Sequence, residues 1–354
     1  MRRDLFVFAG QSNMMGASVL PPKKKISVKN SYEYKHKARR LGASIGDFVV
    51  ANYPVGEFSY IDLEKAYSAD MVNEKGESKL DDYAQNTYFC PAMFNLDSKE
   101  EKTVRPFPSF SEATAPYGVT LAPLLAEEWE QRGQCCAYTH IAKGGVAIIH
   151  FFNRQMREEY VRRIKTDNVP IDDSDGAADY FFEKCKHFIA DAQTVFPDDT
   201  LENKCFFWLQ GESDARNSIV EYETKLDILW EELKKIGFTH FFCIRVNYFG
   251  HDGISNVMKA QENFVAKHSD AYMLTRVASY FTHPLQNERE WFISVPLEIY
   301  RNCRDSFYGY NNHHINEKGF SMIAERATGN LYRVLIENKQ PLLEDELVRA
   351  LITI

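Results

Sequence analysis

The segment Phe6–Gly16 reads FVFAGQSNMMG, an apolar run that stops at Gly10 and is followed at once by the polar residues Gln11–Asn13. A run such as Leu5–Ala9 predicts a strand that is buried on both faces. A serine just beyond a strand that ends on glycine is a candidate nucleophile. The same Ser12 could also be an ordinary turn or helix-capping serine. The rest of the chain decides between these two interpretations.

Length and composition place the chain among large globular proteins. Its 354 residues, 44% of them hydrophobic, are enough to bury a substantial core, and we expect a single domain over residues 1–354. A formal net charge of −8 argues against a nucleic-acid partner, which usually requires a basic face. The histidines and the seven cysteines lack the spacing of metal ligands, so we expect no metal site.

The sequence also lacks membrane and export signals. No stretch approaches the eighteen or more apolar residues of a membrane-spanning helix. The apolar run behind the basic start MRRDLFVFAG is too short for a secretory signal. Scattered cysteines without a C-x-x-C pair are typical of buried thiols in a reducing compartment. We therefore expect a cytoplasmic protein with no membrane partner.

Five apolar runs alternate with segments at helical spacing along most of the chain. The predicted strands are 5–9, 135–142, 205–210, 239–249 and 271–277, and the predicted helices are 118–133, 147–165, 177–195, 218–237, 255–268, 317–337 and 343–352. This alternation predicts an α/β fold with three layers (α/β/α), in which helices cover both faces of a mainly parallel, five-stranded sheet. Residues 17–115 lack this regularity, and we expect a long, aromatic-rich insertion with short elements there.

Three predicted strands end in polar or glycine-rich sequence, and parallel strands direct such ends toward one crevice. The stretches are AGQSN, AKGG and LQGESD. Ser12 could attack an acyl carbon there, while the side-chain amide of Gln210 and the backbone N–H groups of Gly144 and Ser12 surround the resulting oxyanion. Glu212 and Asp214 could position this machinery, or they could simply favour the first turn of a helix through its dipole.

A serine nucleophile needs a general base, and the stretch YGYNNHHINEKGF (308–320) offers two histidines. His313 and His314 lie in a polar turn just before the last long predicted helix. A purely structural, buried histidine is less expected in such a turn. We therefore take one of this pair as the candidate base.

In this order, GQSNMMG, KGGVAI, WLQGESDA and HHINEKGF resemble the four sequence blocks of the SGNH hydrolases. The W-x-Q-G-E-x-D form of the third block resembles more narrowly the branch of sialate O-acetylesterases and acetylxylan-esterase-related proteins. The resemblance implies a flavodoxin-like fold, with the insertion after the nucleophile, and a reaction without a cofactor. It also implies that Ser12 is the nucleophile, that Gly144 and Gln210 complete the oxyanion hole, and that a late histidine is the base.

The last block departs from the Asp-x-x-His of that family. Asn311 stands three residues before His314, and Tyr310 stands three before His313, so neither histidine has the acid. We prefer His314 because the sequence HINEKGF continues as the family does. Asn311 or a backbone carbonyl could orient the imidazole without stabilising its charged form, and Asp305 is a more remote candidate.

The predicted activity is hydrolysis of an O-acetyl ester on a carbohydrate, with an acyl-enzyme on Ser12 and water activated by His314. The candidate substrate-binding residues flank these groups: Gln11, Asn13, Gly145 and His313. Two alternatives stay open, a sugar O-acetyltransferase with the same groups and a catalytically silent glycan-binding protein that has lost its acid. The sequence specifies neither the sugar nor the oligomeric state.

Overall fold

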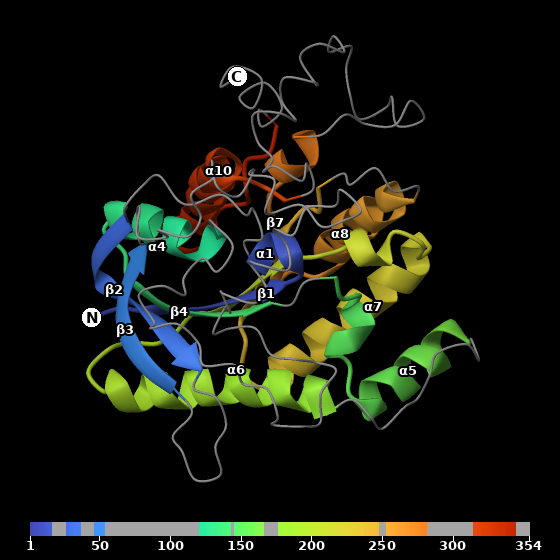
Figure 1. Ribbon diagram of the computed structural model, residues 1–354, viewed down its shortest axis with the longest axis horizontal. Coiled ribbons are helices and arrows are strands. Elements are labelled where there is room, and N and C mark those ends of the chain that lie inside the picture. Colours follow the sequence, from blue (N-terminus) through green and yellow to red (C-terminus); the bar gives the residue numbers. More distant parts are fainter. Residues whose placement is uncertain are drawn as a thin grey trace, which may run out of the picture.

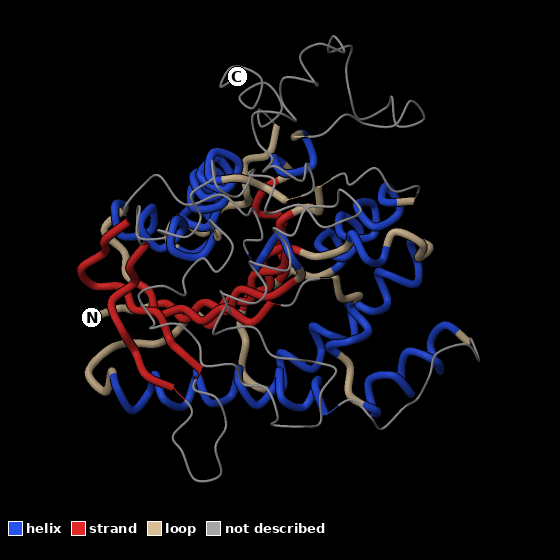
Figure 2. The backbone as a smooth tube through the Cα atoms, viewed as in Figure 1, coloured by secondary structure: helices blue, strands red, loops and turns tan. Residues whose placement is uncertain are grey.

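The computed structural model describes residues 1–15, 26–36, 46–53, 120–142, 145–165, 176–247, 253–281 and 314–344. At its centre is a seven-stranded sheet in the order β3-β2-β4-β1-β5-β6-β7 (Figure 2). The strands are β1 (Asp4–Gly10), β2 (Ile26–His36), β3 (Gly46–Tyr53), β4 (Cys136–Ala142), β5 (Lys204–Leu209), β6 (His240–Ile244) and β7 (Ala271–Thr275). Neighbouring strands run parallel, except that β2 and β3 are antiparallel. The predicted α/β class with a mainly parallel sheet is confirmed.

The predicted number of five strands is wrong, because β2 and β3 extend the sheet beyond β4. Both strands lie inside the segment 17–115 that we expected to be an insertion with short elements. Their sequences, ISVKNSYEYKH and GDFVVANY, mix charged and polar residues with apolar ones. Of these two strands, only β3 lies at an edge of the sheet, and its apolar run is the short stretch 48–51. β2 lies between β3 and β4, but its charged and polar residues interrupt the apolar pattern that the prediction used.

The five predicted strands, numbered by their order along the chain, stand in the spatial order 2-1-3-4-5. This is the flavodoxin-like arrangement, in which the order reverses between the first and third of these strands. Here the reversal falls between β1 and β5. Ligands of such sheets bind beyond the carboxyl ends of the strands at that point. The topology therefore directs attention to the residues that follow Gly10 and Leu209.

The helices begin and end close to the predicted boundaries. The α-helices are α1 (Ser12–Met15), α4 (Leu121–Gln131), α5 (Arg154–Ile164), α6 (Gly176–Val195), α7 (Ile219–Lys235), α8 (Ile254–Lys267) and α10 (Glu317–Leu335), and the 3-10 helices are η4 (Ile148–Phe151), η5 (Glu212–Asp214) and η6 (Val277–Tyr280). The single helix predicted over 147–165 is divided into η4 and α5, because Asn153 caps α5 by accepting from the backbone N–H of Met156. Most of the helix predicted at 343–352 lies outside the described residues.

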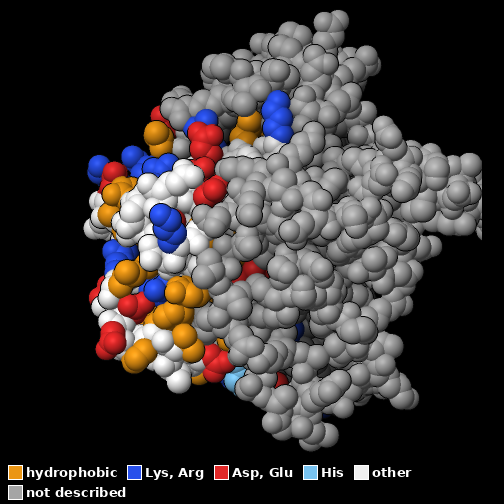
Figure 3. Space-filling model, turned by 60° about the vertical axis from the view of Figure 1, so that its left-hand side comes forward, with side chains coloured by type: hydrophobic (Ala, Val, Ile, Leu, Met, Phe, Trp, Pro, Cys, Tyr) orange, Lys and Arg blue, Asp and Glu red, His pale blue; other side chains and the backbone are white. Residues whose placement is uncertain are grey.

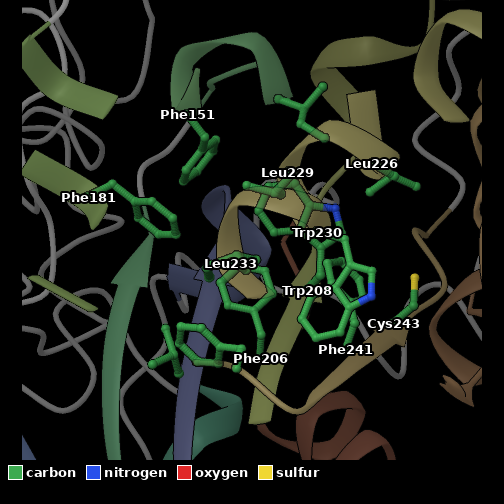
Figure 4. Close-up of a cluster of buried hydrophobic side chains, with 14 of the residues drawn as sticks. Phe151, Phe181, Phe206, Trp208, Leu226, Leu229, Trp230, Leu233, Phe241 and Cys243 are labelled. Carbon is green, nitrogen blue, oxygen red and sulfur yellow. The ribbon is translucent and has the colours of Figure 1, made fainter. Parts of the chain in front are cut away.

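Helices cover both faces of the sheet, which gives the three predicted layers (Figure 1). Phe6 and Phe8 of β1 pack on one face with α4 and α10. Leu5, Val7 and Ala9 point to the other face, where α5, α6, α7 and α8 pack. Figure 4 shows the aromatic part of this second core. Each buried Phe or Leu contributes roughly 1.5–3 kcal/mol relative to an exposed side chain, so β1 is held rigidly from both sides.

No helix among the described residues is both long and apolar enough to cross a membrane. On the described part of the face in Figure 3, basic and acidic side chains are interspersed with apolar ones. The five described cysteines are all buried free thiols. Burial raises the pKa of each of these thiols, which keeps them protonated and unreactive.

Candidate functional site

The carboxyl end of β1 lies against that of β5 at Gly10, and Gly211 just beyond β5 packs against Val257 of α8. Gly10 has φ +154°, and a Cβ there would lie 2.0 Å from the carbonyl oxygen of Leu209. Gly211 has φ +150°, and its Cβ would lie 2.5 Å from Cγ1 of Val257. Only glycine fits both the backbone conformation and the space. The close approach brings the polar residues that follow each strand into contact, and the backbone N–H of Gln11 donates to Leu209 O at 3.3 Å.

Ser12 begins the short helix α1 directly beyond this contact and is 9% exposed. The end of α1 is fixed from behind, because Met14 O lies 2.5 Å from Nε2 of His140 and accepts from the Thr120 hydroxyl at 3.1 Å. Burial lowers the pKa of His140 to about 4, so its ring is neutral near pH 7. The sequence gives one signal for this contact, a histidine inside an apolar strand just before AKGG, and no role was predicted for it.

Gln210 connects three strand ends. Its side-chain nitrogen lies 3.1 Å from Oε1 of Gln11, 3.0 Å from Val146 O and 2.7 Å from Oδ2 of Asp214. The side chain is fully buried, and its Oε1 accepts from the Tyr222 hydroxyl at 2.8 Å. Both amide hydrogens therefore have acceptors inside the protein. The oxyanion role expected of Gln210 stays a prediction; in this geometry its amide hydrogens face acceptors inside the protein.

Asp214 holds the chain that follows β4. Its Oδ2 accepts from the backbone N–H of Ile148 at 2.7 Å, and its Oδ1 lies 2.7 Å from Nδ2 of Asn217 and 3.5 Å from Nζ of Lys225. The carboxylate is 1% exposed. Of the two roles considered for this residue, the contacts support positioning, since they fasten the segment after Gly145 to the third sequence block.

Asn13 was expected to bind substrate, which stays a prediction; the structure places it fully buried and bonded within the protein. Its Nδ2 donates to Oε1 of Glu212 at 2.8 Å and lies 3.1 Å from Oδ1 of Asn247. Its Oδ1 accepts from the backbone N–H of Ile315 at 3.0 Å. This last bond spans 302 positions and joins the residue after Ser12 to the residue after His314.

Glu212 is 5% exposed. Burial raises the pKa of its carboxyl to about 7, against the lowering effect of the hydrogen bonds from Asn13 and the adjacent backbone. Its Oε2 is buried without a well-formed hydrogen bond among the described residues. A carboxyl that titrates near neutral pH in this position fits the predicted positioning role better than a surface helix-terminal charge.

Three further predicted site residues lie in the described part of the chain. Gln11 is buried, and its Oε1 also accepts from the backbone N–H of Ser213 at 3.3 Å. Gly145 is exposed with φ +71°, and His314 is half-buried at the entry to α10. The other predicted site residues lie outside the described part of the chain: Asp305, Asn311, His313 and Gly144. Among the described residues, no group of three or more His, Cys, Asp or Glu side chains could hold a metal ion.

No protein-family model matches the chain, and no curated protein matches it. Solved structures do match. NanS aligns at 12% identity over 95% of this chain and 98% of its own, with a TM-score of 0.49. A protein from Arabidopsis thaliana aligns at 13% identity over 93% and 97%, with a TM-score of 0.43. A carbohydrate acetylesterase from Xanthomonas citri aligns at 13% identity over 79% of this chain and 51% of its own, with a TM-score of 0.36.

Proposed function

We propose that this chain is a serine esterase that hydrolyses O-acetyl esters on a carbohydrate, with Ser12 as nucleophile and His314 as general base. The observation that carries the proposal is the hydrogen bond between Oδ1 of Asn13 and the backbone N–H of Ile315. This bond joins Asn13, which follows Ser12, to Ile315, which follows His314. The carbohydrate acetyl ester comes from the resemblance of the four sequence blocks, and the Ser–His chemistry comes from the residues themselves.

In the proposed reaction, His314 takes the hydroxyl proton of Ser12 while Oγ attacks the acetyl carbon. The carbonyl oxygen becomes an oxyanion, which we assign to the backbone N–H groups of Ser12 and Gly144. The C–O bond to the sugar then breaks, and the imidazolium returns its proton to the leaving sugar oxygen. Water attacks the acetyl-enzyme with His314 again as base, and this step releases acetate and restores Ser12.

Gln210 takes a different role from the one that the resemblance implied. Its amide holds Gln11, Val146 and Asp214 together, so it keeps the loops after β1, β4 and β5 in register. Preorganised donors stabilise an oxyanion only if their positions do not change during the reaction. We therefore propose that Gln210 fixes the loops that carry the oxyanion donors.

The test combines acetate release with active-site labelling. Wild-type protein should release acetate from an aryl acetate and from at least one acetylated sugar, among acetylated sialic acids and xylo-oligosaccharides. A fluorophosphonate should label Ser12, as read by mass spectrometry of the modified peptide. Acetate release only in the presence of a sugar acceptor that becomes acetylated would indicate the transferase. Sugar binding with an unlabelled Ser12 would indicate the silent binding protein.

A further inference from the structure

The side chains of Glu212 and Asn13 form one buried chain of hydrogen bonds that ends on the backbone beside His314. Glu212 lies in η5, Asn13 in α1 and Ile315 before α10, so three separate elements meet. The two bonds measure 2.8 Å and 3.0 Å. Both side chains are shielded from solvent, with Asn13 at 0% and Glu212 at 5% exposure.

The direction of these bonds is determined by the backbone. The N–H of Ile315 can only donate, so Oδ1 of Asn13 must face it. Nδ2 then faces the opposite way, where it needs acceptors. Oε1 of Glu212 and Oδ1 of Asn247 supply them. Oε1 of Glu212 accepts from Nδ2 both in the ionised carboxylate and when the proton sits on Oε2, so Glu212 selects the amide orientation that Ile315 requires.

This arrangement is costly if its only purpose is stability. A buried carboxyl loses its hydration, and one oxygen of Glu212 has no well-formed bond among the described residues to compensate. An apolar side chain of similar size would often serve stability as well or better. The cost points to a functional constraint, and the contact beside His314 shows where that constraint acts.

We propose that Glu212 is a positioning residue, which acts through Asn13 to hold the backbone at Ile315 and so places the His314 imidazole relative to Ser12. This inference rests on the proposed Ser12–His314 function and extends it. Support that a histidine usually receives from an acid at its ring would here reach it in part through its own backbone. Loss of that support should lower the rate of the chemical step, and so kcat, while KM changes little.

The decisive experiment exchanges the polarity of the pair. Asn13→Asp keeps an oxygen for Ile315 but places a carboxylate against Glu212 and removes the donor, so we expect kcat to fall about 100-fold with little change in KM. Asn13→Asp combined with Glu212→Gln restores one donor and one acceptor in the reverse direction. We expect this double variant to recover kcat to within about tenfold of wild type, which is a coupling that only interacting residues show.

A second measurement does not depend on activity. Hydrogen exchange at the Ile315 amide, read by NMR or by mass spectrometry of a peptide that spans it, reports its bond to Asn13. In Glu212→Ala, where Asn13 is intact, we expect this exchange to accelerate about fivefold, the equivalent of one hydrogen bond. Unchanged exchange would overturn the proposal. So would a double variant that regains its thermal midpoint while kcat stays low.

The matched control is Asn203→Asp at the opposite end of the sheet. Asn203 Nδ2 donates to Oδ1 of the buried Asp4 at 2.7 Å, which is the same kind of pair. This variant should lose stability while its kcat per folded molecule is unchanged. If wild-type protein releases no acetate and Ser12 is not labelled, the proposed function fails. The exchange measurement in Glu212→Ala still decides whether Glu212 positions Ile315.

Discussion

The two ends of β1 contain the same kind of pair, an asparagine bonded to a buried carboxyl, in different surroundings. At the amino end, Asp4 accepts from Asn203 at 2.7 Å and Trp129 Nε1 at 3.1 Å, and it lies 3.5 Å from the guanidinium of Arg2. At the carboxyl end, Glu212 has Asn13 and no ion pair among the described residues. Burial raises the pKa of both carboxyls, but Asp4 has a guanidinium beside it that partly offsets this effect, whereas the pKa of Glu212 reaches about 7.

The difference indicates that the two edges of this parallel sheet, at the amino and carboxyl ends of its strands, have different roles. The amino ends of the strands carry contacts that close and stabilise the fold. The carboxyl ends, at the point where strand order reverses, carry a buried network of amides and carboxyls in which Glu212 has a pKa raised to about 7, and perturbed pKa values of this kind are frequent at functional sites. The comparison therefore makes opposite predictions for substitutions at the two ends.

The largest expected effect is on catalysis, and a pair of variants should separate loss of activity from loss of stability. Ser12→Ala should lower kcat about 10⁴-fold or more and leave the unfolding free energy nearly unchanged. Asp4→Ala should do the reverse. It leaves the N–H donors of Trp129 and Asn203 without an acceptor and should lower the unfolding free energy by about 3 kcal/mol, while kcat per folded molecule is preserved. Urea unfolding and acetate release on both variants provide the measurement. Equal activity losses in the two variants would contradict the division between the ends.

The next effect tests the contact between β1 and β5. Gly10→Ala places a Cβ 2.0 Å from Leu209 O and should cost about 4 kcal/mol through strain and overlap. Gly145→Ala is the control, because it also has positive φ but nothing within 4 Å of its Cβ; it should cost only about 1 kcal/mol. Thermal unfolding of both variants compares them. Similar midpoints would mean that the contact at Gly10 relaxes easily.

The smallest effect is a difference in pH dependence. Glu212 has a native pKa of about 7, against an ordinary 4.5, so the native state keeps a proton that the unfolded state loses. Its contribution to stability is present below pH 4.5 and is lost as pH rises to 7, by about 3 kcal/mol. Glu212→Gln removes this loss.

Urea unfolding of wild type and Glu212→Gln at pH 5 and pH 8 measures that effect. The variant should gain about 2.5 kcal/mol relative to wild type between pH 5 and pH 8, since part of the wild-type loss has already occurred at pH 5. His140, with its pKa lowered to about 4, acts in the opposite direction, but it is present in both proteins and cancels in the difference. A difference that does not vary with pH would show that Glu212 stays in one protonation state throughout.

Much of the fold could be predicted from sequence because the central strands are buried on both faces. β1, β4, β5, β6 and β7 each give an apolar run that needs no knowledge of its neighbours. β2 mixes charged and polar residues with apolar ones, and β3 offers only the short apolar stretch 48–51, so their pairing in space is what identifies them as strands. The strand order that follows from the connections then places the ends of β1 and β5 side by side.

The candidate site was less predictable, since the role of an amide depends on what it faces. Sequence patterns predicted that Ser12, Gln210 and Asn13 lie close together, but they could not show which amide hydrogens already have acceptors. The amide nitrogen of Gln210 lies within hydrogen-bond distance of three internal oxygens. Asn13 bonds to Glu212, Asn247 and Ile315. Such partners lie far apart in sequence, so the positioning roles that we propose for these two side chains could be argued only from the tertiary structure.

The bond between Asn13 and Ile315, which closes a loop of 302 positions, has a consequence for folding. β1 can pair only after β4 and β5 have been synthesised, and the contact with Ile315 forms later still. Closing loops of this length is slow compared with forming local helices. The proposed nucleophile Ser12 is thus synthesised early, but the contact beside it forms only when the segment before α10 has docked, so the proposed site is incomplete in a nascent chain.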